Sequence, residues 1–422
     1  MSELQGGIRS ALVGLVLLGC GGMSDLHEDL RTIEGLWSLS GIVSAPAYEG
    51  GTVVAAILRA PTHDGAPWQI VDFQQMTRPG RFRFIVPPGR YRAVAFIDAN
   101  GDLEYEPSER LGAYREYEEI GPGTDRDQLD IEIQGAMREG DAAPQIAAPT
   151  AQIRSLVIGE VESLDAERFE QAIGVMGVWQ PMRFMVEYGA GLWMLQEYDA
   201  DKTPVVFIHG ISGYPQEFRE IIANLDTERF QPWVVQYPSG WDLADSADYF
   251  HRGLEEMYTA HSFERLCLVA HSMGGVVSRE MLNRHFEARE TSYISAFITI
   301  AAPLGGHPAA AMGATMSPVV VPSWRNLVPD GEFMQQLYRR PLREETYHSL
   351  FFTLRDGVVP LQSQLRAEAL DEADFTHHFP NTHVGVLESE SLGEHLAVAL
   401  DRCRGDRGGA PVEAASDAAQ AP

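Results

Sequence analysis

The apolar and polar positions of the chain change their spacing near residue 150. Between residues 36 and 135, short runs of β-branched and aromatic residues alternate with clusters of Pro, Gly and Asp. Each run has the length of a strand and each cluster favours a turn, so the pattern predicts a small all-β sandwich over residues 35–136. Its expected strands lie within 51–60, 68–76, 81–86, 91–97 and 128–133.

From residue 155 to residue 403, apolar strands alternate with amphipathic helices. This alternation predicts an α/β domain with a mainly parallel sheet. We expect strands within 204–210, 230–240, 266–270, 293–303 and 350–356, and helices within 243–258, 275–286 and 391–403. Residues 304–345, rich in Ala, Met, Pro and Val, interrupt the alternation. This segment is interpreted as a cap over the site, with a plain packed insertion as the alternative.

The flanking segments have the composition of a leader, a tether, a linker and a tail. The apolar run of residues 11–20 is too short for a transmembrane helix but suits a signal peptide. Its end, Leu-Leu-Gly-Cys, resembles the bacterial lipobox, so we expect a lipoprotein signal over 1–20 with lipid on Cys20. A cleaved or vestigial leader is the alternative. The remaining expectations are a polar tether (21–34), an Ala- and Pro-rich linker (137–154) and a low-complexity tail (404–422).

Charge and cysteine content narrow the possible partners. The 422-residue chain carries 60 acidic and 32 basic residues, a formal net charge of −28, which disfavours nucleic-acid binding. Its three cysteines are Cys20, Cys267 and Cys403. That count indicates neither a disulfide framework nor a cysteine-based metal site, and Cys267 lies in an apolar run typical of a small core residue. A lipid anchor would place the protein at a membrane of the cell envelope, the outer membrane in a Gram-negative source.

The pentapeptide Ala270-His271-Ser272-Met273-Gly274 has the layout of a nucleophile elbow, G-x-S-x-G, with Ala at the first small position. The chemistry requires small residues on either side of the serine because the strand and helix approach closely there. An expected strand precedes the motif and an expected helix follows it. Ser272 is therefore the candidate nucleophile; a serine that only caps the helix is the alternative.

Serine chemistry also needs two N–H donors for a developing oxyanion. In a nucleophile elbow one donor is the residue after the serine, here Met273. A second loop, residues 209–213, follows the apolar strand 204–208 and has the His-Gly-x layout of lipases. By that resemblance Ile211 supplies the second N–H. His209 is interpreted as structural, because the catalytic His of this fold comes last in the chain.

The order Ser, acid, His restricts the other two candidates to the downstream chain. Asp356 ends an expected strand and is the candidate acid, with Asp371 and Asp374 as weaker candidates. His383 lies just before the final helix and is the candidate base. The remaining downstream histidines, His377, His378 and His395, also stay open for the base.

Together, the segments 204–213, 269–279, 299–306, 356–360 and 381–385 resemble bacterial α/β-hydrolase lipases and esterases, and 323–337 resembles the cap of such enzymes. The resemblance covers roughly residues 185–400. It implies an α/β-hydrolase fold and an acyl-enzyme on Ser272 that needs no metal or organic cofactor. The expected substrate is an ester or lipid. A thioesterase, an amide hydrolase and an inactive hydrolase-fold surface lipoprotein are the alternatives.

One motif lies outside this resemblance. Residues 84–102 resemble transthyretin-like or carboxypeptidase-regulatory-like modules, and an acidic loop begins at their end. The loop has oxygen-bearing side chains at the spacing of a Ca²⁺ loop, although Leu103 stands where glycine is expected. These side chains belong to Asp98, Asn100, Asp102, Glu104, Glu106 and Glu109. An acidic hairpin loop without an ion is the interpretation we favour, and Ca²⁺ binding is the alternative.

Overall fold

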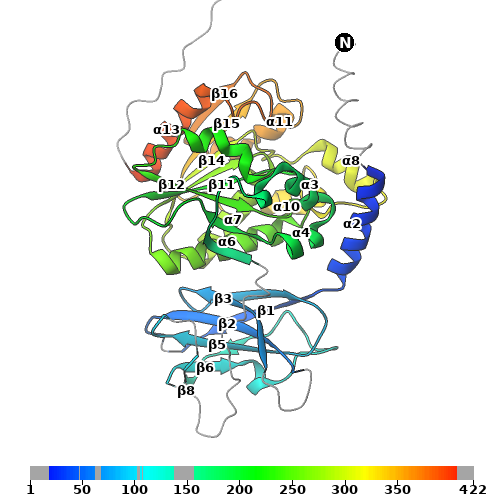
Figure 1. Cartoon of the computed structure of the whole chain (residues 1–422), viewed down its shortest axis with the longest axis vertical. Helices are drawn as coiled ribbons and strands as arrows, with labels where there is room; N and C mark the ends of the chain where they lie inside the picture. The colour runs from blue at the N-terminus through cyan, green and yellow to red at the C-terminus, as the bar shows by residue number, and fades with distance from the viewer. Residues whose placement is uncertain are drawn as a thin grey trace, which may run out of the picture.

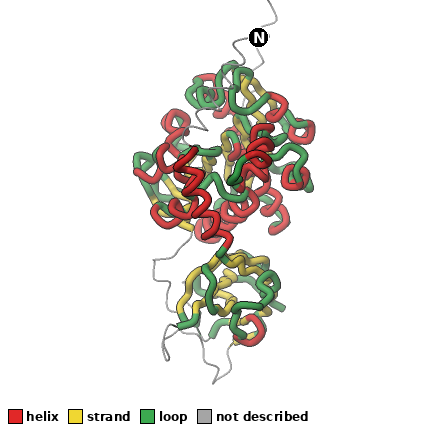
Figure 2. The backbone as a smooth tube through the Cα atoms, turned by 90° about the vertical axis from the view of Figure 1, so that its right-hand side faces the viewer, coloured by secondary structure: helices red, strands yellow, loops and turns green. Residues whose placement is uncertain are grey.

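The computed structural model describes residues 19–46, 48–61, 68–101, 105–106, 108–136 and 156–405. The leader up to residue 18, the linker over 137–154 and the tail from residue 406 lie outside the described residues. Two lobes are visible, a smaller all-β lobe and a larger lobe of mixed helices and strands (Figures 1 and 2). None of the described helices is long and apolar enough to cross a membrane.

The smaller lobe consists of two sheets, with strand orders β4-β1-β7 and β3-β2-β5-β6-β8. Apolar side chains of both sheets form one shared core, including Leu39 of β1 and Phe84 of β4 against Ile57 of β2. Most of the pairing is antiparallel, as expected for a sandwich. The strands are β1 (Trp37–Ser44), β2 (Thr52–Arg59), β3 (Gln69–Met76), β4 (Arg81–Val86), β5 (Tyr91–Asp98), β6 (Arg110–Ala113), β7 (Ile131–Glu132) and β8 (Gly135–Ala136), with a 3₁₀ turn η1 (Tyr114–Tyr117).

The larger lobe contains one eight-stranded sheet in the order β16-β15-β14-β13-β11-β12-β10-β9. Strands β11 to β16 pair in parallel, and β10 runs antiparallel to β12. This confirms the mainly parallel sheet predicted from the sequence. The strands are β9 (Leu156–Val161), β10 (Ala190–Met194), β11 (Thr203–Ile208), β12 (Phe230–Gln236), β13 (Leu266–His271), β14 (Ile294–Ile300), β15 (Tyr347–Thr353) and β16 (Phe375–Phe379).

Helices cover both faces of this sheet (Figure 1). The central strand β13 shows why: Leu268 and Ala270 pack in the core cluster that contains α6 and α7, whereas Cys267 and Val269 pack in the cluster that contains α13. The helices and 3₁₀ turns are η2 (Glu167–Phe169), α3 (Gln171–Trp179), α4 (Pro181–Glu187), η3 (Pro215–Phe218), α5 (Arg219–Ala223), α6 (Leu243–His261), α7 (Met273–Ala288), α8 (Pro308–Met316), α9 (Pro322–Asn326), α10 (Glu332–Gln336), α11 (Leu361–Gln364), α12 (Ala367–Asp371) and α13 (Glu390–Arg404).

The segment expected to be a polar tether, residues 21–34, is instead part of a helix, α2 (Gly19–Glu34). Leu26 is fully buried against Val178 and Val321, with Leu30 at the edge of the same cluster. Two apolar residues four apart lie on one helix face, but this short pattern is a weak helix signal because polar residues surround it. α2 thus packs on the larger lobe before the chain enters the sandwich (Figure 1).

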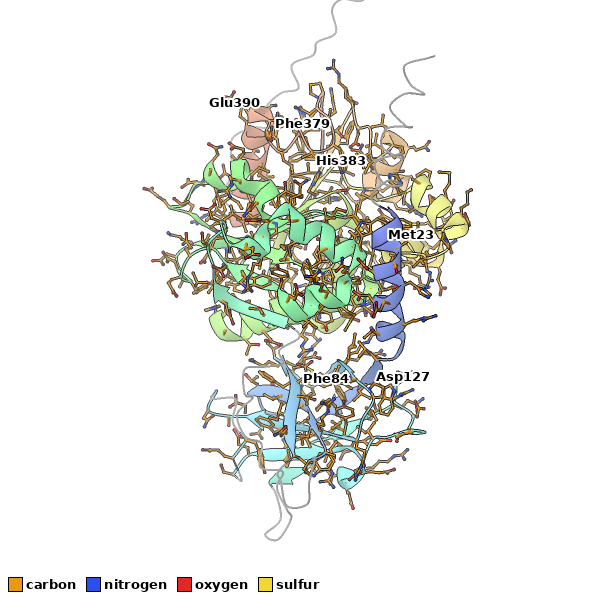
Figure 3. The ribbon with its side chains drawn as sticks, turned by 45° about the vertical axis from the view of Figure 1, so that its right-hand side comes forward. Met23, Phe84, Asp127, Phe379, His383 and Glu390 are labelled. Carbon is orange, nitrogen blue, oxygen red and sulfur yellow. A yellow bond between two sulfur atoms is a disulfide. The ribbon has the colours of Figure 1, made fainter. Side chains whose placement is uncertain are left out.

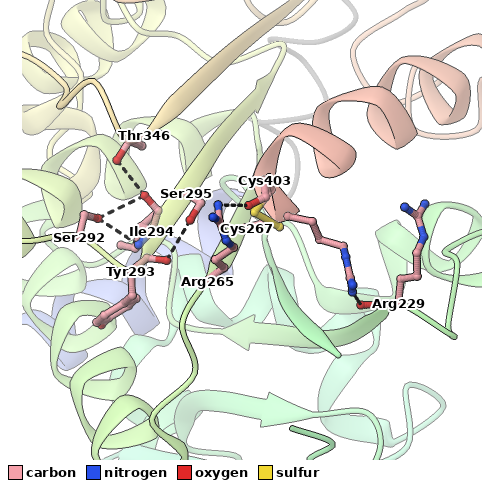
Figure 4. The surroundings of a disulfide bond; sticks show 10 residues. Arg229, Arg265, Cys267, Ser292, Tyr293, Ile294, Ser295, Thr346 and Cys403 are labelled. Atoms are coloured by element: carbon pink, nitrogen blue, oxygen red, sulfur yellow. Dashed lines mark hydrogen bonds between the residues drawn. A yellow bond between two sulfur atoms is a disulfide. The ribbon is translucent and has the colours of Figure 1, made fainter. Parts of the chain in front are cut away.

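Cys267 of β13 is a buried core residue, as its apolar run indicates, but it also forms a disulfide with Cys403 of α13, which the cysteine count did not indicate (Figure 4). Both cysteines are fully buried, and 136 residues separate them in sequence. Arg265 Nη1 donates to the carbonyl of Cys403 at 3.3 Å and adds a second link between the strand and the helix. The last helix is therefore fastened to the strand that leads to Ser272.

The two lobes meet along α6, which packs against β3. Arg252 of α6 donates to the Asp72 carboxylate at 2.9 Å, and both side chains are largely buried. Arg83 of β4 forms ion pairs with Asp245 and Asp248 of α6. Separating the two charges of a buried ion pair leaves each charge unpaired and costs free energy. These ion pairs therefore fix the relative position of the lobes.

The acidic loop of the sandwich uses two of its carboxylates to hold its own backbone. Asp98 accepts from the N–H of Gly101 at 2.7 Å, and Glu109 accepts from the N–H groups of Ala99 and Glu106 at 2.8 and 3.0 Å. Residues 102–104 lie outside the described residues. The acidic hairpin loop without an ion and the Ca²⁺-binding loop therefore both stay predictions.

Candidate active site

Ser272 occupies the sharp turn between β13 and α7, at the edge of the sheet where the parallel strands end. Its φ of 53° and ψ of −132° are strained for a residue with a side chain. The N–H of Ser272 donates to the carbonyl of Ile300 at 2.9 Å and holds the turn. A Cβ on Gly274 would lie 2.4 Å from the carbonyl oxygen of Ile208, so only glycine fits there. These features are those of a nucleophile elbow.

The structure brings the three residues singled out from the sequence into one chain of hydrogen bonds. His383 Nε2 lies 2.9 Å from Ser272 Oγ, and His383 Nδ1 lies 2.8 Å from Asp356 Oδ2. His383 stands in the loop between β16 and α13, at the end of the sheet remote from the sandwich (Figure 3). This is the geometry in which an imidazole removes a proton from a serine while a carboxylate holds the ring.

The Asp356 carboxylate is held on both oxygens. Oδ1 accepts from the N–H groups of Val358 and Val359 at 2.8 and 2.7 Å. Oδ2 accepts from Thr353 Oγ1 at 2.7 Å as well as facing His383. Burial alone would raise the pKa of Asp356, but the hydrogen bond and charge of His383, with the other donors, bring its pKa below the ordinary value. The carboxyl is therefore ionised at neutral pH.

Burial lowers the pKa of His383 from its ordinary 6.5, and this outweighs the hydrogen bond that His383 donates to Asp356, which raises it. The neighbouring His271 acts in the same direction as burial. At neutral pH the ring is thus uncharged and Nε2 is available to accept a proton. A general base in this state suits nucleophilic attack by a serine hydroxyl.

A second pair, for which the sequence offered little signal, supports the loop of His383. His271 Nδ1 lies 3.0 Å from Glu217 Oε1, and His271 Nε2 lies 3.1 Å from the backbone oxygen of His383. His271 thus links the 3₁₀ turn η3, which carries Glu217, to the loop of His383. The position of His271 directly before Ser272 was the one available clue, whereas Glu217 had none.

The turn 209–213 passes directly beside the nucleophile. A Cβ on Gly210 would lie 3.0 Å from Ser272 Oγ and 3.3 Å from the Met273 nitrogen, so the absence of a side chain allows this approach. Within the described ranges, the N–H groups of Ile211 and Met273 have no hydrogen-bond acceptor. Two unpaired donors beside a nucleophile have the layout of an oxyanion hole.

Among the described residues, the other histidines and aspartates singled out from the sequence take no part in the hydrogen-bonded chain of Ser272, His383 and Asp356. His209 is fully buried, with Nε2 2.8 Å from Gln236 Oε1, and it braces the turn as expected for a structural residue. His377 stacks on His395 with ring centroids 3.8 Å apart. Asp374 accepts from the N–H of His348 at 2.8 Å. Within the described part of the chain, neither Asp371 at the end of α12 nor His378 in β16 forms a hydrogen bond with Ser272, His383 or Asp356.

The predicted cap, residues 304–345, contains the short helices α8, α9 and α10. Val321 and Trp324 pack with Ile211 of the turn beside the nucleophile. Ser272 and His383 are only 5% and 7% exposed. The segment thus lies against the turn beside the nucleophile.

The fold and the site together indicate which class of protein this is. The strand order and the strand–Ser272–helix turn are those of an α/β hydrolase; β9 pairs in parallel with β10, so these two strands run against the other six. Residues 232–320 match the lecithin:cholesterol acyltransferase family. A 97-residue stretch is 29% identical to lecithin-cholesterol acyltransferase-like 4 of Arabidopsis thaliana, which is 22% of this chain and 18% of that protein. The chain therefore spans under a fifth of the length of this curated relative.

Solved structures that resemble the chain include two lipases. One is the mature form of Bacillus licheniformis lipase BlEst2, at 16% identity and a TM-score of 0.39, covering 48% of this chain and 94% of that one. The other is Aspergillus fumigatus lipase B, at 15% identity and a TM-score of 0.41, covering 58% and 60%.

Proposed function

We propose that the protein is a serine hydrolase that cleaves carboxylic esters of lipid-like acyl groups through an acyl-enzyme on Ser272. The observation that carries the proposal is the unbroken hydrogen-bonded chain from Ser272 through His383 to Asp356. The three residues also follow one another in the order typical of α/β hydrolases.

In the proposed reaction, Ser272 Oγ attacks the carbonyl carbon of the ester and gives its proton to His383 Nε2. Asp356 stabilises the resulting imidazolium through Nδ1. The N–H groups of Ile211 and Met273 bind the negative charge on the carbonyl oxygen. His383 then protonates the leaving alcohol, and a water molecule activated by His383 releases the acyl group and restores Ser272.

The surface around the site favours an apolar substrate. Val358, close to Asp356, and Val384, next to His383, are 52% and 57% exposed. His307, at the start of α8, makes a 2.7 Å hydrogen bond to the carbonyl of Val358, so α8 begins at this rim. α8 adds exposed Met312 and Met316. Exposed apolar side chains next to the triad and along α8 are typical of a surface that meets lipid.

We further propose that Cys20 carries a lipid anchor and that the protein lies at an envelope membrane. α2 begins beside α8, so an anchor there would hold the apolar rim near the membrane (Figures 1 and 3). The Cys267–Cys403 disulfide favours an exported protein, because such bonds persist in oxidising compartments. Mass spectrometry of the mature protein should find a lipid-modified N-terminal Cys20; an unprocessed Met1 would contradict the anchor.

Acyl transfer to an alcohol is the second candidate, because residues 232–320 match an acyltransferase family. The same acyl-enzyme would then react with a hydroxyl group of a sterol or another alcohol instead of water. The two candidates share Ser272, His383 and Asp356 and differ only in the acceptor.

The test uses phosphatidylcholine vesicles and p-nitrophenyl esters of short and long acyl chains, with and without a sterol. A hydrolase releases free fatty acid at a rate that the sterol does not alter, whereas a transferase forms sterol ester. Ser272→Ala should abolish both products, and His378→Gln, which changes an exposed histidine of β16, should change neither. Equal turnover by Ser272→Ala would overturn the proposed function.

A further inference from the structure

Two histidines and a glutamate gather far from the site, at the junction of α6 and α7. His251 and Glu255 are one helical turn apart on α6, and His285 lies in the last turn of α7. Their nearest ligand atoms all lie within 4.8 Å of one another. His251 Nε2 is 3.8 Å and His285 Nδ1 is 3.6 Å from the same carboxylate oxygen, Glu255 Oε1.

Both of these ring nitrogens are buried, and neither has a hydrogen-bond partner among the described residues. The tautomer of His285 shows why the lack of a partner on Nδ1 matters. Ser292 Oγ donates to the carbonyl of Ile294 at 3.2 Å, so at 3.1 Å it accepts the Nε2–H of His285. The lone pair of Nδ1 then points at a carboxylate oxygen. The two electron-rich atoms repel each other, and a cation between them would turn this repulsion into attraction.

The charges of the three groups suit a metal ion. Burial lowers the pKa of His251 to about 4 and also lowers the pKa of His285. Burial would raise the pKa of Glu255, but His285, His251 and Arg289 bring it down to about 2. Two imidazoles and one carboxylate whose ligand atoms lie this close together are groups that bind divalent metals.

We propose that His251, Glu255 and His285 bind a zinc ion, with water completing a four-coordinate site. Two imidazoles and a carboxylate are a ligand set that zinc takes up in proteins. Zinc bonds near ~2.1 Å at tetrahedral angles would separate each ligand pair by about 3.4 Å. To reach this separation, His285 Nδ1 and His251 Nε2 would each move slightly closer to Glu255 Oε1, from 3.6 and 3.8 Å. The two ring nitrogens would have to approach each other by a larger distance.

Surrounding residues hold the ligands in place. Ser292 fixes the orientation of His285 through Nε2, and Tyr293 donates to Glu255 Oε1 at 3.0 Å. Arg289 donates to the other oxygen, Oε2, at 3.0 Å and leaves one lone pair of Oε1 for the metal. Such outer hydrogen bonds orient metal ligands and tune their basicity.

The role of the ion would be structural. His285 follows Ser272 by thirteen positions, about 20 Å along a helix, so the ion takes no part in ester chemistry. It would join α6 to α7 at the side where the sandwich docks, because Thr77 of the sandwich contacts both Arg289 and Glu255.

The test is a calorimetric titration of the untagged, chelator-treated full chain with ZnCl₂. We expect one Zn²⁺ per chain with a Kd at or below about 1 µM, and a melting temperature higher by roughly 5 °C or more at a hundredfold excess over Kd. His251→Gln keeps a good helix former at a partly exposed position, and it should weaken binding at least a hundredfold. The matched control His378→Gln removes an exposed histidine and should bind as wild type does.

Cobalt provides a readout that does not depend on a variant folding. Co²⁺ added to the wild-type chain should give the intense visible absorption of a four-coordinate site, and Zn²⁺ should abolish it. No Zn²⁺ heat and no Co²⁺ bands, or wild-type affinity in folded His251→Gln, would overturn the proposal.

Discussion

The disulfide between Cys267 and Cys403 should contribute a large part of the stability of the larger lobe. It closes a loop of 136 residues between β13 and α13, and it is fully buried. The chain-entropy relation for a loop of this length gives about 5 kcal/mol, and measured values for native disulfides are typically about 2–4 kcal/mol. We therefore expect reduction to lower the free energy of unfolding by about 3–5 kcal/mol, and the melting temperature by roughly 10 °C.

The assay is equilibrium urea unfolding of the wild-type chain with and without reductant, beside the double variant Cys267→Ala/Cys403→Ala. Reductant should move the wild-type midpoint to lower urea and leave the double variant where it is. Hydrogen exchange should show α13 losing protection first, because that helix is fastened to the sheet through Cys403. Coincident midpoints for oxidised and reduced wild type, or an equal shift of the double variant, would refute the reasoning.

Three further predictions concern the site. Gly210→Ala would place a methyl group 3.0 Å from Ser272 Oγ, and kcat/KM should fall about a hundredfold or more while circular dichroism stays unchanged; wild-type kinetics would contradict the close approach. Asp356→Asn should lower kcat by roughly 10³- to 10⁴-fold, because the amide no longer stabilises the imidazolium, and a loss under tenfold would argue against its role. Because burial lowers the pKa of His383 and only the neutral ring acts as base, kcat/KM should fall as pH falls, with a midpoint below 6.5; a midpoint above 6.5 would contradict this.

The sequence was most informative where the chemistry imposes local constraints. Ser272 could be assigned because a strained turn needs small neighbours, and those neighbours are visible in five consecutive residues. Asp356 and His383 followed from chain order and from their places at the ends of predicted elements. The structure brings both within hydrogen-bonding distance of their expected partners.

Contacts between distant segments could not be predicted in the same way. Nothing near Cys267 indicates that it meets Cys403, although an even pair remains once Cys20 is assigned to a lipid. Glu217 reaches His271 across 54 residues, and His285 meets Glu255 only because α6 and α7 pack together. Such pairs depend on tertiary packing rather than on local periodicity.

α2 could not be predicted for a different reason. Its sequence is mostly polar, and among its described side chains Leu26 and Leu30 supply the apolar contacts of the buried face. A helix of this kind is stabilised chiefly by its contacts with Val178 and Val321 rather than by its own propensity. Its local pattern alone is therefore compatible with a tether.

The central claim is that Ser272 is a nucleophile activated by His383. The most direct measurement is intact-protein mass spectrometry of the folded chain after brief exposure to a fluorophosphonate, followed by peptide mapping. We predict one adduct per chain, on Ser272, that is lost in Ser272→Ala and forms at least a hundredfold more slowly in His383→Ala. An unlabelled wild-type chain, or an adduct that persists in Ser272→Ala, would contradict the account.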